Sequence, residues 1–307
     1  MIDYVFPYVN IADKEWQRSF LYHTGQSVNP NSERFRDFSF LKYIFRSIET
    51  NAPFINNVFI LVHSKRQLPK WLNKKCSKLK IVEHKDFIPN TYLPTFNSNT
   101  IEAFLYNIKD LSETFIYGND DFLFLNKSTE SDFFKDNKLL FSYRGNRNII
   151  NKGFVGCCKR TWQLVANTFK PKPEDILPIG KLPWLFIKQF HGSASPRFLS
   201  DCKACHKQFE KEIEQSLTMV RDTEVNYNQY LDGYYSLVKG HAIRKEPEEI
   251  GTYFSKEDNG THLVSDIENC KTPMVCINDT DSMTVVDYRA VITCLEKRFP
   301  NKSNFEI

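Results

Sequence analysis

Short apolar blocks alternate with amphipathic stretches over the first 125 residues of the chain. DYVFPYV at 3–9 and VFILV at 58–62 are rich in aromatic and β-branched residues, which predicts strands. The second block is typical of a strand covered on both faces, and a buried helix remains the alternative there. A helix is predicted from Phe38, because apolar residues recur at helical spacing: Leu41, Ile44, Phe45 and Ile48.

The same alternation then repeats, with strands predicted at 80–83 and 114–117. Asn99 is expected to cap the intervening helix, because Glu102 follows three residues later and completes a capping box. The apolar stripe of that helix is Ile101, Phe104, Leu105 and Ile108. Alternating strands and helices predict an α/β, Rossmann-like fold with a mostly parallel sheet.

Beyond residue 125 the alternation fades. We expect an irregular section at 126–200, a largely helical section at 201–241 and a final helix at 287–299. The stripe expected in the helical section is Val225, Leu231, Tyr235 and Val238. No repeat or linker is visible, so we predict one domain over 1–307: an α/β core (1–125), an irregular and helical insertion or lid (126–275) and a C-terminal segment (276–307).

Composition places the chain among ordinary globular proteins, with 41% hydrophobic and 25% charged residues, which excludes the disordered and fibrous classes. The net charge of +4 fits anionic small substrates and gives no reason to expect nucleic acid. No run approaches the roughly 18 apolar residues of a membrane span, and the first residues lack a signal-peptide pattern. We therefore expect a cytoplasmic protein; contact with the inner face of the cytoplasmic membrane and self-association stay open.

One cysteine cluster, CKACH, contains Cys202, Cys205 and His206 in the haem-attachment pattern. Haem attachment of this kind requires export, for which no signal is visible. A zinc site is a second interpretation, and the packing of one helix face is the favoured one, because the same residues continue at helical spacing to Phe209 and Ile213.

The segment FIYGNDDFLFL places Asn119, Asp120 and Asp121 within an apolar run. They directly follow the strand predicted at 114–117, and ligands of open α/β sheets bind just beyond the carboxyl ends of strands. Oxygen ligands of this kind suit Mg²⁺ or Mn²⁺, and an ion bridging two phosphates of a nucleotide needs only one or two protein carboxylates. The alternative is that one aspartate caps a turn while the other is solvated.

Polar residues also gather in four separated blocks, and their order is distinctive. The second block contains RFRD, RSIE followed by AP, LPTFNS, IEA and FIYGNDDF between residues 34 and 122. The others are DYVFPYVN at 3–10, FH at 190–191 with MVRDTEVNYNQY at 219–230, and CINDTDS at 276–282 with RFPNKSNFE at 298–306. Through these blocks nearly the whole chain resembles the Stealth family of sugar-phosphate transferases, which includes bacterial capsule and cell-surface polysaccharide phosphotransferases and the animal N-acetylglucosamine-1-phosphotransferase.

The resemblance implies a phosphotransferase that moves a hexose-1-phosphate, with N-acetylhexosamine-1-phosphate favoured, from a UDP-sugar to a hydroxyl of an oligosaccharide or polysaccharide acceptor. UMP would be released, and the product would belong to a bacterial capsule or another surface polysaccharide. Two alternatives stay open: a metal-dependent glycosyltransferase that releases UDP, and a binding module that has lost the chemistry.

The resemblance also implies roles for individual residues. Asp120 and Asp121 would bind Mg²⁺ or Mn²⁺, with Asn119 orienting them, and Asp121 would also count among the catalytic residues with His191 and Arg221. His191 would be the general base or acid, because an imidazole titrates near neutrality. Guanidinium groups match phosphate geometry, so Arg221 would hold a phosphate together with Arg34 and Arg36. The remaining substrate-binding residues would be Asp3, Asn10, Asp37, Asn97, Glu102, Asn226, Asn278 and Asp279.

Several of these assignments have equally good structural explanations. Asp3 is expected near the nucleoside, and Asn97 and Glu102 near the sugar, but helix capping would account for Asn97 and Glu102 as well. The family pattern commonly ends its first block in Val-Asp, where this chain has Val9 and Asn10, so that carboxylate is either Asp13 or absent. The family's third block often has His-x-Pro and an arginine followed four residues later by an aspartate. In this chain Gly192 follows His191, and Val225 stands at the aspartate position, with Glu224 and Asn226 beside it.

Overall fold

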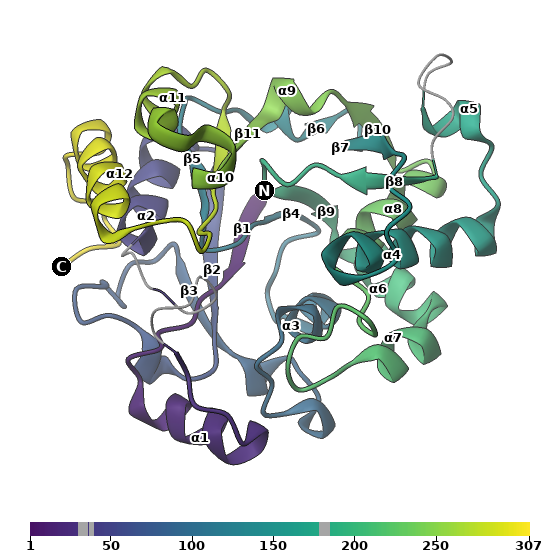
Figure 1. Ribbon diagram of the computed structural model, residues 1–307, viewed down its shortest axis with the longest axis horizontal. Coiled ribbons are helices and arrows are strands. Elements are labelled where there is room, and N and C mark those ends of the chain that lie inside the picture. The colour runs from purple at the N-terminus through teal and green to yellow at the C-terminus, as the bar shows by residue number, and fades with distance from the viewer. Residues whose placement is uncertain (30–35, 37–39, 178–184) are drawn as a thin grey trace.

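A computed structural model describes residues 1–29, 36, 40–177 and 185–307. Its central sheet has the strand order β3-β2-β1-β4-β9 (Figure 1). These strands are β3 (Leu79–Glu83), β2 (Ile55–Val62), β1 (Ile2–Pro7), β4 (Thr114–Tyr117) and β9 (Ser195–Phe198). The first four are parallel and β9 is antiparallel to β4. The predicted α/β fold with a mostly parallel sheet is confirmed.

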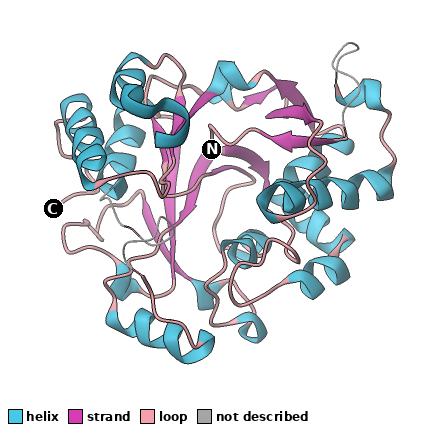
Figure 2. Ribbon diagram, in the orientation of Figure 1, coloured by secondary structure: helices cyan, strands magenta, loops and turns pink. Residues whose placement is uncertain are grey.

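Successive side chains of the central strands point to opposite faces of the sheet and enter two different hydrophobic cores. Tyr4 and Phe6 of β1 face a core that includes helices α2 (Phe40–Asn51) and α12 (Val285–Arg298). Val5, between them, faces the opposite core, which contains Phe104. Both faces of the sheet are therefore covered, and this explains the continuous apolar runs in β1 and β2, where a half-exposed strand would alternate with polar residues (Figure 2).

A second hydrophobic unit lies beside the central sheet. Its strands are β6 (Phe134–Lys135), β7 (Lys138–Asn146), β8 (Phe186–Gln189) and β10 (Ala242–Lys245). Helices α4 (Gly153–Phe169) and α8 (Tyr230–Val238) pack against each other and against these strands, with Trp162 and Tyr234 among the buried contacts. The prediction of an irregular section at 126–200 was therefore wrong, because 17 residues of it form the helix α4.

The remaining elements complete these layers. A three-stranded sheet combines β5 (Phe122–Phe124), β12 (Met274–Ile277) and β11 (Gly251–Phe254). The other helices are α1 (Lys14–Thr24), α3 (Ser98–Ala103), α5 (Pro173–Ile176), α6 (Leu199–Gln208), α7 (Glu210–Ser216), α9 (Pro247–Ile250), α10 (Lys256–Asn259) and α11 (Leu263–Asn269). Among the described residues, no helix is both long and apolar enough to cross a membrane.

Two details of the predicted helices need correction. Asn97, not Asn99, caps α3, because its side chain accepts the Asn99 N–H at 3.0 Å. Val225 precedes α8 and is exposed, so it is not part of that helix's buried stripe. The final helix and the helical section at 201–241 are confirmed.

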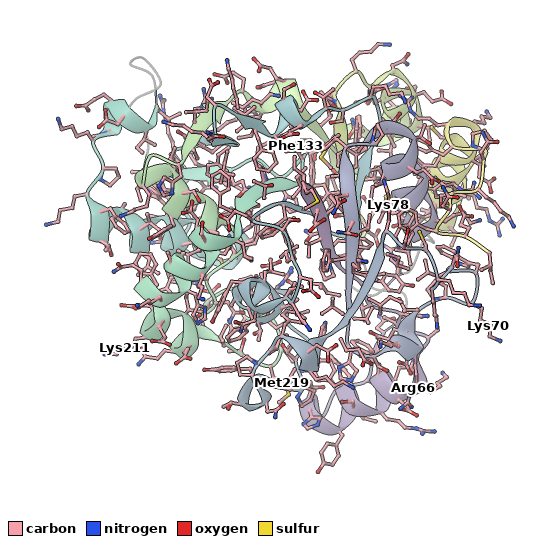
Figure 3. The ribbon with its side chains drawn as sticks, turned by 180° about the vertical axis from the view of Figure 1, so that it is seen from behind. Arg66, Lys70, Lys78, Phe133, Lys211 and Met219 are labelled. Carbon is pink, nitrogen blue, oxygen red and sulfur yellow. The ribbon has the colours of Figure 1, made fainter. Side chains whose placement is uncertain are left out.

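Charged side chains gather at the periphery of the molecule. Seen from behind, Arg66, Lys70 and Lys211 are labelled at its outer edge (Figure 3). Arg66 forms an ion pair with Glu15 of α1, on the side where Met219 also lies. The main-chain oxygen of Met219 accepts the Phe96 N–H at 2.8 Å, and this bond joins the segment that precedes α8 to the segment that precedes α3.

Candidate active site

A cavity of about 620 Å³ lies at the carboxyl edge of the central sheet. Its lining residues lie where strands end: Pro7 is the last residue of β1 and Tyr8 and Val9 follow it, His63 follows β2, His84 follows β3, and Asn119 to Asp121 follow β4. The opposite wall is formed by Phe154 and Cys157 of α4 and by residues of the segment 221–229. Ligands of open α/β sheets bind in this position, so the cavity is the candidate active site.

The turn Gly118–Asp121 carries the two neighbouring aspartates into this cavity. Gly118 is needed because a Cβ there would lie 2.1 Å from the Tyr4 hydroxyl oxygen. Asp120 is exposed and Asp121 is half-buried. Asp121 Oδ2 accepts the Cys276 thiol at 3.2 Å, whereas Oδ1 is buried and has no hydrogen-bond partner in the structure.

Asp121 is also close to His191. Its carboxylate, a His191 ring nitrogen and the Cys276 sulfur all lie within 4.8 Å of one another. Burial raises the pKa of Asp121, and the nearby His191 acts in the opposite direction. A buried carboxylate oxygen without a donor fits a cation at this point, and the neighbouring Asp120 adds the hard oxygen ligands that Mg²⁺ or Mn²⁺ requires.

His191 is held by aromatic side chains. Its Nδ1 lies 3.1 Å from the Tyr230 hydroxyl, and the rings of Phe122, Phe154 and Tyr253 surround it at centroid distances of 5.5 to 6.2 Å. Burial lowers the pKa of His191, while Asp121 acts against that change. The imidazole is therefore neutral at pH 7 and available to accept a proton.

Glu102 is a second buried carboxyl group in the cavity. Oε1 accepts the Tyr117 hydroxyl at 3.0 Å, and Oε2 is buried without a partner. Burial raises the pKa of Glu102 to about 7, against the opposing effect of Arg221. Beneath them, Arg197 lies 5.4 Å from the Tyr117 ring centroid and forms an ion pair with Asp232. Glu102 can thus either accept or donate a hydrogen bond near neutral pH.

Arg221 lines the cavity, and its guanidinium donates to the Ser98 hydroxyl at the start of α3. Its positive charge acts on Glu102, Asp121 and His191. Arg221 is therefore placed to meet an anionic ligand bound among these groups.

The predicted site residues divide into two sets. Nine line the cavity: Asn97, Glu102, Asn119, Asp120, Asp121, His191, Arg221, Asn278 and Asp279. Four described residues do not line it: Asp3, Asn10, Arg36 and Asn226. Arg34 and Asp37 lie outside the described residues.

The position of Asp3 does not fit its predicted role as a contact of the nucleoside. It stands near the amino end of β1, away from the carboxyl edge, and is fully buried. Its carboxylate accepts main-chain N–H groups from Asn57 at 3.0 Å and Ser112 at 2.9 Å, together with the side-chain amides of Asn56 and Asn57. Asp3 therefore links β1 to the first residues of β2 and to the segment before β4 rather than contacting a nucleoside.

Asn226 also has a structural position. Its side-chain oxygen accepts the Asp222 N–H at 2.8 Å and the Asn97 amide at 3.0 Å, and its amide donates to the Thr218 hydroxyl at 2.9 Å and to the Ser216 carbonyl. Fully buried, it fixes the segment 216–226 against α3, which is why it cannot reach a substrate.

Arg36 and Asn10 are likewise engaged by the protein. Arg36 makes a two-point contact with Asp279, at 2.6 and 2.8 Å, and donates to the main-chain oxygens of Thr280 and Met283. Asn10 donates to the Gln67 main-chain oxygen at 3.2 Å. Arg36 thus positions the loop that carries Asn278 and Asp279 to the cavity instead of projecting into it.

Other cavity residues were not identified from the sequence: His63, Gln67, His84, Cys276 and Tyr230 are in or beside the site. A usable signal existed for His84, which directly follows the predicted strand at 80–83 as Asn119 follows the strand at 114–117. Tyr230 and Cys276 look like core residues in the sequence, and only tertiary structure brings them to Asp121 and His191.

Cys202 and Cys205 of the CKACH segment lie on the buried face of α6, in two different hydrophobic cores. His206 Nδ1 lies 3.1 Å from the Ala103 carbonyl oxygen, and its ring packs against Phe104 and Tyr106. The packing interpretation is confirmed for Cys202 and Cys205, but the predicted single helix face is divided, because α6 ends at Gln208 and Ile213 belongs to α7.

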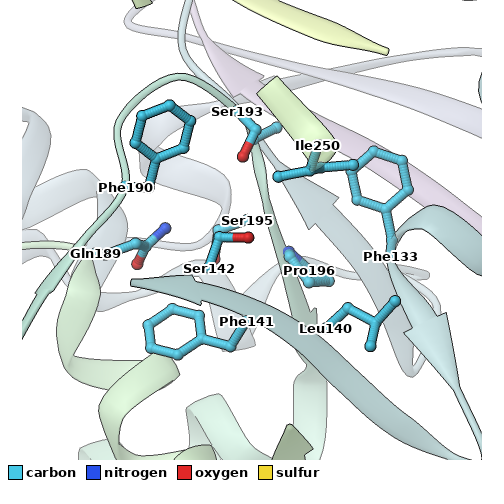
Figure 4. Close-up of a pocket in the computed structure, with 11 residues that line it drawn as sticks. Phe133, Leu140, Phe141, Ser142, Gln189, Phe190, Ser193, Ser195, Pro196 and Ile250 are labelled. Carbon is cyan, nitrogen blue, oxygen red and sulfur yellow. The ribbon is translucent and has the colours of Figure 1, made fainter. Parts of the chain in front are cut away.

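A second, much smaller cavity lies between β7, β8 and β9. Its volume is about 10 Å³, and Phe141, Phe190 and Phe133 surround the polar side chains of Gln189 and Ser195 (Figure 4). This volume suits about one water molecule, so the cavity cannot hold a substrate.

Comparison with known proteins agrees with the resemblance seen in the sequence. Residues 34–141 match the family described as Stealth protein CR2, conserved region 2. The chain is 32% identical to the capsular polysaccharide phosphotransferase WcwK of Streptococcus pneumoniae, over 99% of this chain and 98% of that protein. It is 30% identical to the exopolysaccharide phosphotransferase cps2G of Lactiplantibacillus plantarum, with coverage of 99% and 96%.

A more distant relative is the capsular polysaccharide phosphotransferase SacB of Neisseria meningitidis serogroup A, which is 29% identical over 99% of this chain and 57% of its own length. Among solved structures, the galactosyltransferase LgtC in complex with donor and acceptor sugar analogues aligns over 96% of this chain and 95% of its own, with a TM-score of 0.42 and 10% identity. On its full-length similarity to WcwK and cps2G, the chain belongs to the Stealth family and is a phosphotransferase.

Proposed function

We propose that the protein transfers a hexose-1-phosphate, with N-acetylhexosamine-1-phosphate favoured, from a UDP-sugar to a hydroxyl of a saccharide acceptor and releases UMP. The reaction would serve capsule or surface-polysaccharide synthesis in the cytoplasm of a bacterium. The observation that carries the proposal is the buried, unpartnered Asp121 oxygen beside His191 in the cavity at the carboxyl edge of the sheet. Full-length similarity to proteins named capsular polysaccharide phosphotransferases supports it.

A divalent ion fits this cavity. Asp120 and Asp121 would hold Mg²⁺ or Mn²⁺, with Asn119 orienting the turn, and the bound ion would offset the negative charge of the donor's diphosphate. Cys276 is a softer ligand than these metals prefer, and its thiol already donates to Asp121, so we assign it no metal-binding role.

The chain's own groups supply the remaining functions. His191, neutral because burial lowers its pKa, would accept the proton of the acceptor hydroxyl as oxygen attacks phosphorus. Arg221 would contact the phosphate oxygens, where charge is highest. The unpartnered Oε2 of Glu102 would bind a sugar hydroxyl. The α/β core would bind the donor, with the insertion as the opposite wall and the C-terminal segment supplying Asn278 and Asp279.

Identification of the released nucleotide tests the proposal. Incubation with a UDP-sugar, an acceptor saccharide and Mg²⁺ should yield UMP, together with a phosphodiester signal in the phosphorus NMR spectrum of the product. Release of UDP would instead establish a glycosyltransferase. A binding module would form no product, so loss of product in the Asp120→Asn and Asp121→Asn variants would exclude that alternative. Product formation that is unchanged in both variants would instead show that other groups bind the metal.

A further inference from the structure

One end of the active-site cavity holds several polar atoms without partners. His63, Gln67 and His84 line this end, which we call the imidazole end, together with Trp16 and Phe96. His63 Nδ1, Gln67 Nε2 and both ring nitrogens of His84 are buried and make no hydrogen bond in the structure. Gln67 is 0% exposed and His84 is 6% exposed. Unpaired buried polar atoms are costly, so their concentration in a cavity indicates a ligand that completes them.

The orientation of Gln67 is fixed. Its Oε1 accepts the main-chain N–H of His63 at 3.1 Å, and this contact requires the oxygen rather than the amide nitrogen at that position. Nε2 is therefore a donor with no acceptor. The Gln67 main-chain oxygen accepts Asn10 Nδ2, which holds the turn after β2 against the end of β1.

Flat side chains enclose the same end. The His63 and Phe96 rings are nearly parallel, at 22° and a centroid distance of 6.4 Å. Trp16 of α1 meets Phe96 edge to face at 5.6 Å, and His84 meets His63 edge to face at 6.0 Å. A planar ligand therefore has aromatic surface to contact as well as polar atoms to pair with.

The imidazole end is not a site for an anion. Burial lowers the pKa of His84 to about 3 and also lowers that of His63, so both rings are neutral at pH 7. The charged groups that act on His63 are Asp13 and Glu83, and both are acidic. Arg221 lies instead at the part of the cavity shared with Glu102 and Asp121. The cavity thus offers a neutral polar end for a base and a charged end for phosphates.

We propose that the imidazole end selects the uracil base of the donor, with Gln67 and His84 reading its imide edge. The inference rests on the proposed function, since it concerns the base of the same nucleotide-sugar. The O4 carbonyl of uracil would accept from Gln67 Nε2, and N3–H would donate to the unprotonated nitrogen of His84. Cytosine carries an amino group in place of O4, so it would set a second donor against the fixed Gln67 donor and leave that donor unpaired.

Binding of nucleoside monophosphates to the unmodified protein gives the first test. Isothermal titration with UMP, CMP and 3-methyl-UMP in the presence of Mg²⁺ should show UMP binding about 10- to 100-fold more tightly than the other two, the range expected when a buried group loses its partner. Equal affinities for UMP and CMP would overturn base selection while leaving sugar-phosphate transfer intact. The absence of nucleotide binding would contradict both proposals.

Two matched exchanges give the second test. His84→Phe removes both ring nitrogens from the cavity and should weaken UMP binding and bring the UMP and CMP affinities together. His206→Phe makes the same exchange at another histidine that is 6% exposed but lies outside the cavity, and it should leave the affinity ratio unchanged. Gln67→Met repeats the test at the fixed donor. If His84→Phe and Gln67→Met fold, as judged by circular dichroism, and keep the preference for UMP, these groups pair with water only and the proposal is wrong.

Discussion

Two carboxyl groups in the cavity, those of Asp121 and Glu102, each have one buried oxygen without a hydrogen-bond partner. Burial raises the pKa of both. Such groups destabilise the folded chain at neutral pH, because a carboxylate loses its hydration without full compensation. Their retention in a cavity is typical of groups whose partners arrive with the substrate.

The Glu102→Gln variant should therefore change how stability depends on pH. The folded-state pKa of Glu102 is about 7, above its ordinary value of 4.5, so between these values the folded protein binds more protons than the unfolded chain. Wild-type stability should fall as pH rises through this window, and the variant should lack that loss, gaining up to about 3 kcal/mol relative to wild type at pH 8 compared with pH 4.5. Urea unfolding at both pH values measures the difference.

Glu174→Gln, on an exposed side chain of α5, provides the control, because this exchange removes a carboxylate without touching the cavity. Unfolding free energies of wild type and Glu102→Gln that run parallel from pH 4.5 to 8 would show that Glu102 titrates normally.

At the scale of single residues, the sequence identified those whose local context is unusual. Asp120 and Asp121 stand out because they interrupt an apolar run at a strand end. Arg36 could not be assigned in this way, because its partner Asp279 is 243 positions away and the ion pair exists only in the fold. Asp3 was misassigned because a strand residue at the amino end looks the same in sequence as one at the carboxyl end.

At the scale of elements, the passage from β4 to β5 positions the aspartates. It depends on close contact between the Gly118 backbone and Tyr4 of β1, whose ring packs at 5.5 Å from that of Phe124 in β5. Strands β1, β4 and β5 therefore share one tightly packed point directly beneath the site.

Gly118→Ala should destabilise the protein by about 1–3 kcal/mol, the usual cost of overpacking a core, and should reduce transfer activity by displacing Asp120 and Asp121. Tyr4→Phe removes the hydroxyl that lies 2.1 Å from the added Cβ, and that hydroxyl has no hydrogen-bond partner in the structure. The double variant should thus be more stable than the sum of the single changes predicts, as measured by urea unfolding of all four proteins. Strict additivity would mean that the strain lies elsewhere.

Elements of the first 125 residues were predictable because each strand is a short apolar run and each helix has a clear stripe. The section 126–200 was not predictable in the same way. The α4 stretch carries Gly153, Gly156 and polar residues that obscure its stripe, and its buried side is defined by contact with α8 about 70 residues later. Helix α3 has only six residues, so its own pattern could not separate Asn97 from Asn99 as the cap.

At the scale of the whole molecule, an ion pair connects the C-terminal residues to helix α2. Arg46 of α2 makes a two-point contact with Glu306, both distances being 2.8 Å, and also donates to the Phe299 main-chain oxygen. The two side chains are 9% and 4% exposed. The preceding residue, Phe305, stacks on Phe45 in the core.

Glu306→Ala should lower the free energy of unfolding by about 3–5 kcal/mol, because it leaves the Arg46 charge buried without its partner. Replacing both residues, Arg46→Met with Glu306→Leu, should cost less than Glu306→Ala alone. Denaturant unfolding of the three proteins provides the measurement. A double variant that is less stable than Glu306→Ala would show that the charges themselves, rather than the filled space, hold this end in place.

Arg197 joins the two hydrophobic units below the cavity: it belongs to β9 of the central sheet, while its partner Asp232 belongs to α8. Separation of these units would leave the Arg197 guanidinium, which is 1% exposed, without its carboxylate partner. The two units are therefore held together next to Tyr117 and Glu102, so we expect substrates to enter the cavity and products to leave it without these units separating.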